Sequence, residues 1–124
     1  MIWDVVLWLY IINSAILINH EIDSAFWHEW ELFGMKGGVE GFLIIHLPLW
    51  AGLLYGLVAL SRHQHAGLVF SCVVSAVGIF AFCIHTYFLR KGRPEFNTVF
   101  SKAHLVGTLA VSVVQLSVTA YILF

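Results

Sequence analysis

The chain has 124 residues, of which 60% are hydrophobic and 10% are charged, and its formal net charge is −1. Its mean hydropathy of +0.90 is too high for a soluble domain of this length, which needs more polar surface to cover its core. The near-zero charge provides no basic surface for nucleic acid, so we expect no nucleic-acid partner.

Four apolar stretches cover nearly the whole chain, at residues 3–22, 40–60, 66–89 and 103–124. Each has about 20 residues, which is enough to cross a hydrocarbon layer of about 30 Å as a helix. Because lipid does not tolerate unpaired backbone groups, each stretch is expected to be an α-helix. The sequence therefore predicts an all-α fold. This is an integral membrane four-helix bundle with up-down topology, forming one domain over 1–124 in the lipid bilayer.

The first stretch continues with a helical period into an amphipathic segment at 23–33. It has no basic amino-terminal region and no cleavage site, so we expect it to be retained rather than removed as a signal peptide. The period separates an apolar stripe of Ile22, Phe26, Trp30 and Phe33 from a polar stripe of His20, Ser24, His28 and Glu31. This segment either continues the first helix or bends into the headgroups.

The second and fourth helices carry different packing signals. Gly52 and Gly56 form a G-x-x-x-G pattern, which suits close contact with another helix or with a second copy of the chain, as in a homo-oligomer. In the fourth helix, polar residues recur at spacings of four or three: His104, Thr108, Ser112, Gln115 and Thr119. A single polar stripe on an apolar membrane helix is expected to face the interior of the bundle.

The basic residues set the expected orientation in the membrane. The loops after the first and third helices carry Lys36, Arg90, Lys91, Arg93 and Lys102, whereas the opposite side carries Arg62 and the amino terminus. The positive-inside rule then places the 23–39 and 90–102 loops in the cytoplasm and both termini outside. Arg90, Lys91 and Arg93 are either a topology signal alone or also a site for a lipid headgroup.

Four histidines are expected at similar depth on this cytoplasmic side, one on each helix: His20, His46, His85 and His104. Four imidazoles from four helices at one level predict a metal site, with Asp23 and His28 as further ligands. Imidazole with carboxylate suits Zn²⁺ or Fe²⁺. Glu21 and Glu29 lie at the same end and are the candidate general bases of a metal-dependent reaction.

Several functions remain open on the sequence alone. The first is a metal-dependent membrane enzyme acting on a lipid-like substrate, and enzymatic activity itself is undecided. The alternatives are a haem protein for electron transfer, with two of the histidines as axial ligands, a small transporter of protons or metal ions, and a structural membrane subunit.

The motif HEIDSAFWHEWELF at 20–33, followed by a glycine-rich break and three further spans, resembles a family of small bacterial four-helix membrane proteins. Its members are of unknown function and share an H-E-I-D…E-W-x-x-F signature. The residues that carry the resemblance are His20 to Asp23, the glutamates beside Trp30, and Phe33. The resemblance implies a bacterial plasma membrane and no established activity.

Overall fold

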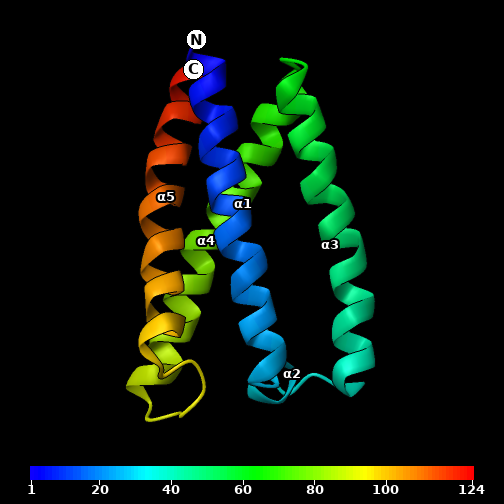
Figure 1. Cartoon of the computed structure of the whole chain (residues 1–124), viewed down its shortest axis with the longest axis vertical. Coiled ribbons are helices and arrows are strands. Elements are labelled where there is room, and N and C mark those ends of the chain that lie inside the picture. The colour runs from blue at the N-terminus through cyan, green and yellow to red at the C-terminus, as the bar shows by residue number, and fades with distance from the viewer.

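The computed structural model describes all 124 residues as four long helices and one short helix. The long helices are α1 (Ile2–Phe26), α3 (Gly38–Ser61), α4 (His65–Arg90) and α5 (Val99–Leu123), and α2 is a single turn at Glu29–Leu32. The long helices alternate in direction, so both termini lie at one end of the bundle (Figure 1). The opposite end carries α2 and the 91–98 loop, and we call it the loop end. Each long helix is long and apolar enough to cross a membrane, which confirms the predicted all-α membrane bundle.

Helix α1 buries one side of its surface in the bundle and exposes the opposite side. The buried residues recur every three or four positions: Val6, Tyr10, Asn13, Leu17, His20 and Ser24. Ile22 and Phe26 of the apolar stripe are instead largely exposed. Asn13, His20 and Ser24 on the buried side are polar, and the exposed side is mostly apolar, which is the arrangement expected of a helix whose surroundings are lipid.

The amphipathic segment combines the two predicted arrangements. Helix α1 continues to Phe26, and the chain then turns at His28, whose φ of 53° lies in the left-handed region. The turn directs α2 back across the loop end, where Trp30 is buried against the ring of Phe42. The segment is therefore a helical continuation followed by a separate turn of helix.

Asn13 is the centre of a hydrogen-bond network between α1 and α5. Its amide nitrogen donates to the Ser112 hydroxyl at 2.9 Å and to the Gln115 side-chain oxygen at 2.9 Å. Its side-chain oxygen accepts from the Thr108 hydroxyl at 2.9 Å. All four residues are fully buried, as is Thr119. The α5 polar stripe therefore faces inward from Thr108 to Thr119, whereas His104 at its start is only partly buried.

The same network continues from α5 to α4. The amide nitrogen of Gln115 donates to the Ser71 backbone carbonyl at 3.1 Å and to its hydroxyl at 2.9 Å. Ser71 also bonds Thr119 at 2.8 Å between the hydroxyl oxygens. The three helices α1, α4 and α5 are therefore joined in the bundle interior by hydrogen bonds among buried polar side chains and the Ser71 backbone carbonyl.

Helix α3 packs on the other helices through small residues. A Cβ on Gly56 would lie 2.3 Å from the Tyr10 hydroxyl and 2.7 Å from the Phe70 Cβ. At the turn into α4, a Cβ on Gly67 would lie 2.5 Å from the Leu60 nitrogen. Contacts within the chain therefore use the Gly56 face, and association of copies through Gly52 and Gly56 stays a prediction.

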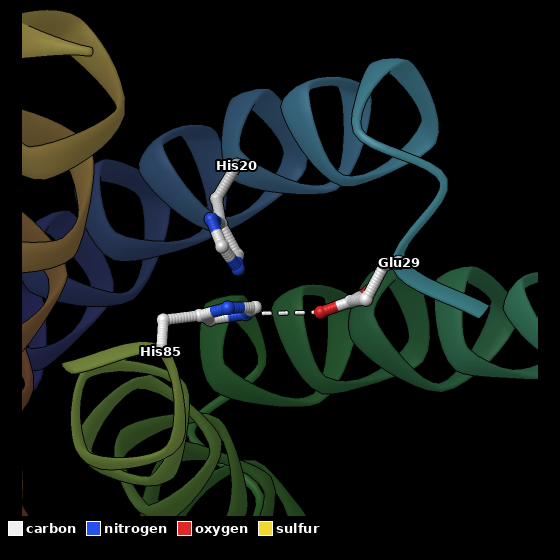
Figure 2. A group of neighbouring side chains, drawn as sticks. All are labelled: His20, Glu29 and His85. Atoms are coloured by element: carbon white, nitrogen blue, oxygen red, sulfur yellow. Dashed lines mark ion pairs between the residues drawn. The ribbon is translucent and has the colours of Figure 1, made fainter. Parts of the chain in front are cut away.

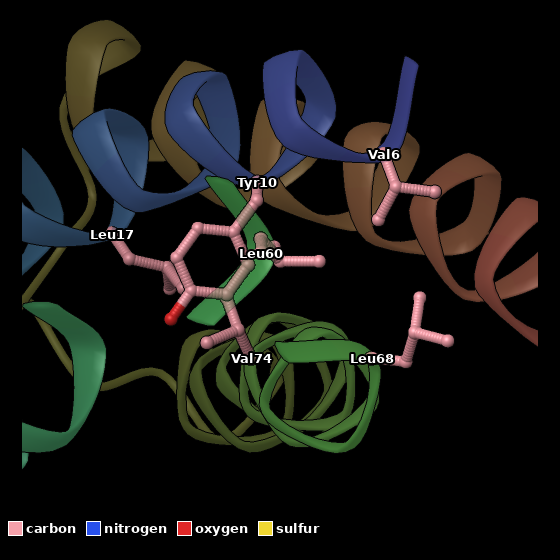
Figure 3. Packing of buried hydrophobic residues seen from close by; sticks show 6 residues of the cluster. All are labelled: Val6, Tyr10, Leu17, Leu60, Leu68 and Val74. Carbon is pink, nitrogen blue, oxygen red and sulfur yellow. The ribbon is translucent and has the colours of Figure 1, made fainter. Parts of the chain in front are cut away.

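The apolar core lies toward the termini end, away from α2 and the 91–98 loop. Figure 3 shows its six members, contributed by α1, α3 and α4: Val6, Tyr10, Leu17, Leu60, Leu68 and Val74. The Tyr10 hydroxyl donates to the Leu53 carbonyl at 2.7 Å, which gives this otherwise apolar cluster one polar contact with α3. At the loop end, buried polar and aromatic side chains lie beside a few aliphatic ones such as Leu32 and Leu105.

Candidate metal centre

Three side chains from three elements meet at the loop end of the bundle. They are His20 from α1, Glu29 from α2 and His85 from α4, all buried, with one potential ligand atom each and these atoms within 4.8 Å of one another. Figure 2 shows the three side chains converging, with one ring nitrogen of His20 directed at the His85 ring. Nε2 of His85 lies 2.9 Å from Oε1 of Glu29. We call this group the His–Glu cluster.

The geometry of the His–Glu cluster suits a single ion. Ligands on a tetrahedral zinc at about 2.1 Å lie roughly 3.4 Å apart, so a spread of 4.8 Å closes with small side-chain rotations. The rings of His20 and His85 are in edge contact, with centroids 4.9 Å apart. This contact favours one ion, held between neighbouring rings, over a macrocycle inserted between them.

Unpartnered polar atoms collect around the cluster. Five buried side-chain atoms at this end have no hydrogen-bond partner in the protein: Nδ1 of His20, Oδ2 of Asp23, Oγ of Ser24, Nε1 of Trp27 and Nδ1 of His85. A buried polar group without a partner costs about 1–3 kcal/mol. The loop end therefore has buried donors and acceptors for which the protein provides no partner, as expected at a site that binds a polar species.

Phe96 covers the cluster from the 91–98 loop. It is 1% exposed, and its ring centroid lies 4.1 Å from that of His85 and 5.4 Å from that of His20. Its φ of 64° is left-handed, a conformation uncommon for a bulky side chain. Phe96 was not predicted as a site residue, although a lone aromatic residue in a polar, basic loop indicates a buried contact.

His46 lies outside the cluster, paired with Glu21. Its Nε2 is 2.7 Å from Oε2 of Glu21, and its Nδ1 is 2.7 Å from the carbonyl of Phe42. A carbonyl only accepts, so Nδ1 carries a hydrogen, and the Nε2 contact holds a further proton shared with Glu21. Both ring nitrogens of His46 are therefore engaged, so the structure does not bring this predicted ligand into the cluster.

His104 of α5 also lies outside the His–Glu cluster, where it contacts Asn19 of α1. Its Nδ1 donates to the Phe100 carbonyl at 2.7 Å, which leaves Nε2 to accept from the amide of Asn19. Both ring nitrogens are therefore already used. Asp23 lines the same small hollow as His104 and is not among the three clustered side chains.

His28 and Glu29 are the remaining predicted residues of the amphipathic segment, the first exposed and the second buried. His28 is exposed, stacks on Trp30 with centroids 4.9 Å apart, and lies 3.7 Å from Glu31. It is not part of the cluster. Glu29, predicted as a general base, instead lies among the ligand atoms.

The basic loop is exposed and partly neutralised. Arg93 donates two hydrogen bonds to the Glu95 carboxylate, at 2.6 and 3.1 Å. These bonds hold the pKa of Glu95 below its ordinary value and raise the pKa of Arg93. Arg90 and Lys91 have no carboxylate partner, and the Lys91 ammonium lies 5.6 Å from the centre of the Tyr87 ring. Of the three predicted headgroup ligands, two are free.

Comparison with known proteins identifies a family but no activity. The model of a family of unknown function, DUF6713, matches residues 6–122, so the chain belongs to that family. No curated protein and no solved structure matches the chain.

Proposed function

We propose that this member of DUF6713 is a membrane metalloprotein that binds one divalent ion, Zn²⁺ or Fe²⁺, through the His–Glu cluster. The observation that carries the proposal is the burial of two imidazoles and a carboxylate with their ligand atoms within 4.8 Å. Two histidines and one carboxylate make up the ligand set of hydrolytic zinc sites and of non-haem iron sites.

An ion held by three protein ligands keeps a coordination position open for water or substrate, which is typical of catalytic rather than structural sites. We therefore favour a metal-dependent membrane enzyme with a lipid-like substrate, in which Glu29 acts as a ligand. Glu21 is not among the clustered ligand residues and shares a proton with His46 at 2.7 Å, so it is the better candidate for proton transfer. The reaction itself stays unassigned.

The orientation follows from the distribution of basic residues over the fold. Five of the six lie in or beside the segments at the loop end, and Arg62 lies at the α3–α4 turn. By the positive-inside rule we propose that the loop end and its metal site face the cytoplasm of a bacterial plasma membrane. Fusion of a periplasm-dependent reporter to either terminus tests this, because both termini are then outside.

The test of the metal site is elemental analysis of protein purified in detergent without added chelator. We expect about one zinc or iron ion per chain, as for a single three-ligand site. His20→Ala, His85→Ala and Glu29→Gln should each remove most of the metal. His104→Ala and His28→Ala are matched controls at the same end and should retain it. A metal-free wild type, or equal loss in the controls, would disprove the assignment.

A further inference from the structure

A half-open cavity of about 280 Å³ lies between α1, α3 and α4, next to the His–Glu cluster but built from other residues. Its walls are apolar and include Leu17, Leu49, Trp50, Phe70 and Val74. In Figure 1, α3 stands away from α1 along the lower half of the bundle. Because all three helices are long enough to span a membrane, the open side of the cavity faces lipid.

Glu21 and His46 are the ionisable residues of this lining, and the Trp50 indole adds one N–H group. A largely apolar cavity with a few convergent polar atoms is the usual form of a small-molecule site, and about 300 Å³ is the lower end of the usual volume range. A volume of 280 Å³ suits the head and first carbons of a ligand, with the remaining chain continuing through the open side into the bilayer.

The hydrogen bonds of the Glu21–His46 pair determine which kind of ligand head group would bind. The shared proton lies between Nε2 of His46 and Oε2 of Glu21, at 2.7 Å. Oε1 of Glu21 has no hydrogen-bond partner, and the Glu21 side chain is 21% exposed. Whichever residue holds the shared proton, Oε1 carries no hydrogen, so it accepts. The pair therefore recognises a group that donates a hydrogen bond.

Charge excludes the commonest membrane lipids as occupants. The cavity lining contains no lysine or arginine, and Arg90 and Lys91 are exposed at the end of α4. Whichever residue holds the shared proton, the Glu21–His46 pair carries no net charge, so a phosphate or an ammonium group in this apolar cavity would lack a compensating charge. The head is therefore uncharged.

We propose that this cavity, the Glu21–His46 groove, binds a neutral lipid with a hydroxyl head, the hydroxyl donating to Oε1 of Glu21 and the chain lying against α3. The ligand class covers long-chain alcohols and quinols, which share an uncharged O–H on an apolar tail. The inference needs no metal, because neither Glu21 nor His46 belongs to the His–Glu cluster. The groove can therefore bind its ligand even if the cluster holds no ion.

The experiment is photolabelling of the full-length protein in phosphatidylcholine vesicles. The probe is a sixteen-carbon alcohol with a diazirine close to the hydroxyl, and its methyl ether is the matched control. We expect the alcohol to label segments 46–53 and 70–77 and unlabelled alcohol to compete. The ether should label these segments several-fold less. If unlabelled alkyl hydroquinone competes better than hexadecanol, the preferred ligand is a quinol. If hexadecanol competes better, the preferred ligand is a long-chain alcohol.

Two variants test the groove independently. Gly52→Leu should fill it and abolish specific labelling; a Cβ at this position lies 3.5 Å from the Phe70 ring, so Gly52→Ala fits and controls for folding. Glu21→Leu should also lower labelling several-fold, whereas Glu40→Leu, at an exposed glutamate of the same end, should not. Equal labelling by alcohol and ether, or labelling unchanged in Gly52→Leu, would overturn the proposal. Metal content, measured on the same samples, reports separately on the cluster.

Discussion

Replacing Asn13 with leucine should destabilise the bundle measurably, because Asn13 makes three hydrogen bonds across the α1–α5 interface. Leucine has the same number of side-chain heavy atoms, branched at the same carbon, so the change removes the hydrogen bonds without creating a cavity. Hydrogen bonds between membrane helices contribute about 0.6 kcal/mol each on average. Three such bonds give an expected loss of about 2 kcal/mol in the free energy of unfolding.

The assay is reversible unfolding in mixed micelles by titration with a denaturing detergent, followed by circular dichroism. Ser117→Ala is the control, since its exposed hydroxyl bonds only the Val113 carbonyl of its own helix, and it should change stability by less than about 0.5 kcal/mol. A double-mutant cycle with Thr108→Val should show a coupling of about 0.6 kcal/mol. An Asn13→Leu protein as stable as the wild type would refute the view that the network holds α1 to α5.

Three further predictions concern the close contact at Gly78, the cover of the His–Glu cluster by Phe96, and the Arg93–Glu95 ion pair. A Cβ on Gly78 would lie 2.1 Å from the Ser112 hydroxyl oxygen, so Gly78→Ala should cost about 1–3 kcal/mol in the same assay. Adding Ser112→Ala should recover part of this loss, and no recovery would mean that the clash lies elsewhere. Phe96→Ala removes the cover of the His–Glu cluster, and loss of bound metal to a chelator should accelerate roughly tenfold; an unchanged rate would contradict this cover. Arg93→Ala should raise the pKa of Glu95 toward its ordinary value in a carboxyl-carbon NMR titration. The Arg93–Glu95 interaction in the wild type is present above the ordinary carboxyl pKa and is lost as the pH falls through the lowered one. An unshifted Glu95 would show that Arg93 is not its partner.

The spans and the polar stripe could be predicted because both depend only on local sequence. A helix rises by a fixed amount per residue, so the depth of a side chain follows from its position in the span. This is why His20 and His85, which meet in the cluster, could be expected at one level.

The direction in which a side chain points around the helix axis was harder to predict. It depends on which helices are neighbours and on their rotation, and neither is encoded by spacing within one helix. His46 and His104 lie at the loop end as expected, yet they face Glu21 and Asn19 instead of the cluster. Glu29 reaches the ligands only through the left-handed turn at His28, which no periodicity indicates.

Helix α3 depends on different forces from the other three helices. Two side-chain hydrogen bonds, from Tyr10 to the Leu53 carbonyl and between Glu21 and His46, connect it to the rest of the bundle. Apolar contact alone provides little driving force for association in lipid. The tight crossing at Gly67 fixes one end of α3, while the glycines before Val39 connect the other. The loop end of α3 is therefore held by the Glu21–His46 pair and the Trp30–Phe42 contact, and loss of these two contacts would widen the Glu21–His46 groove without breaking the hydrogen-bond network among α1, α4 and α5.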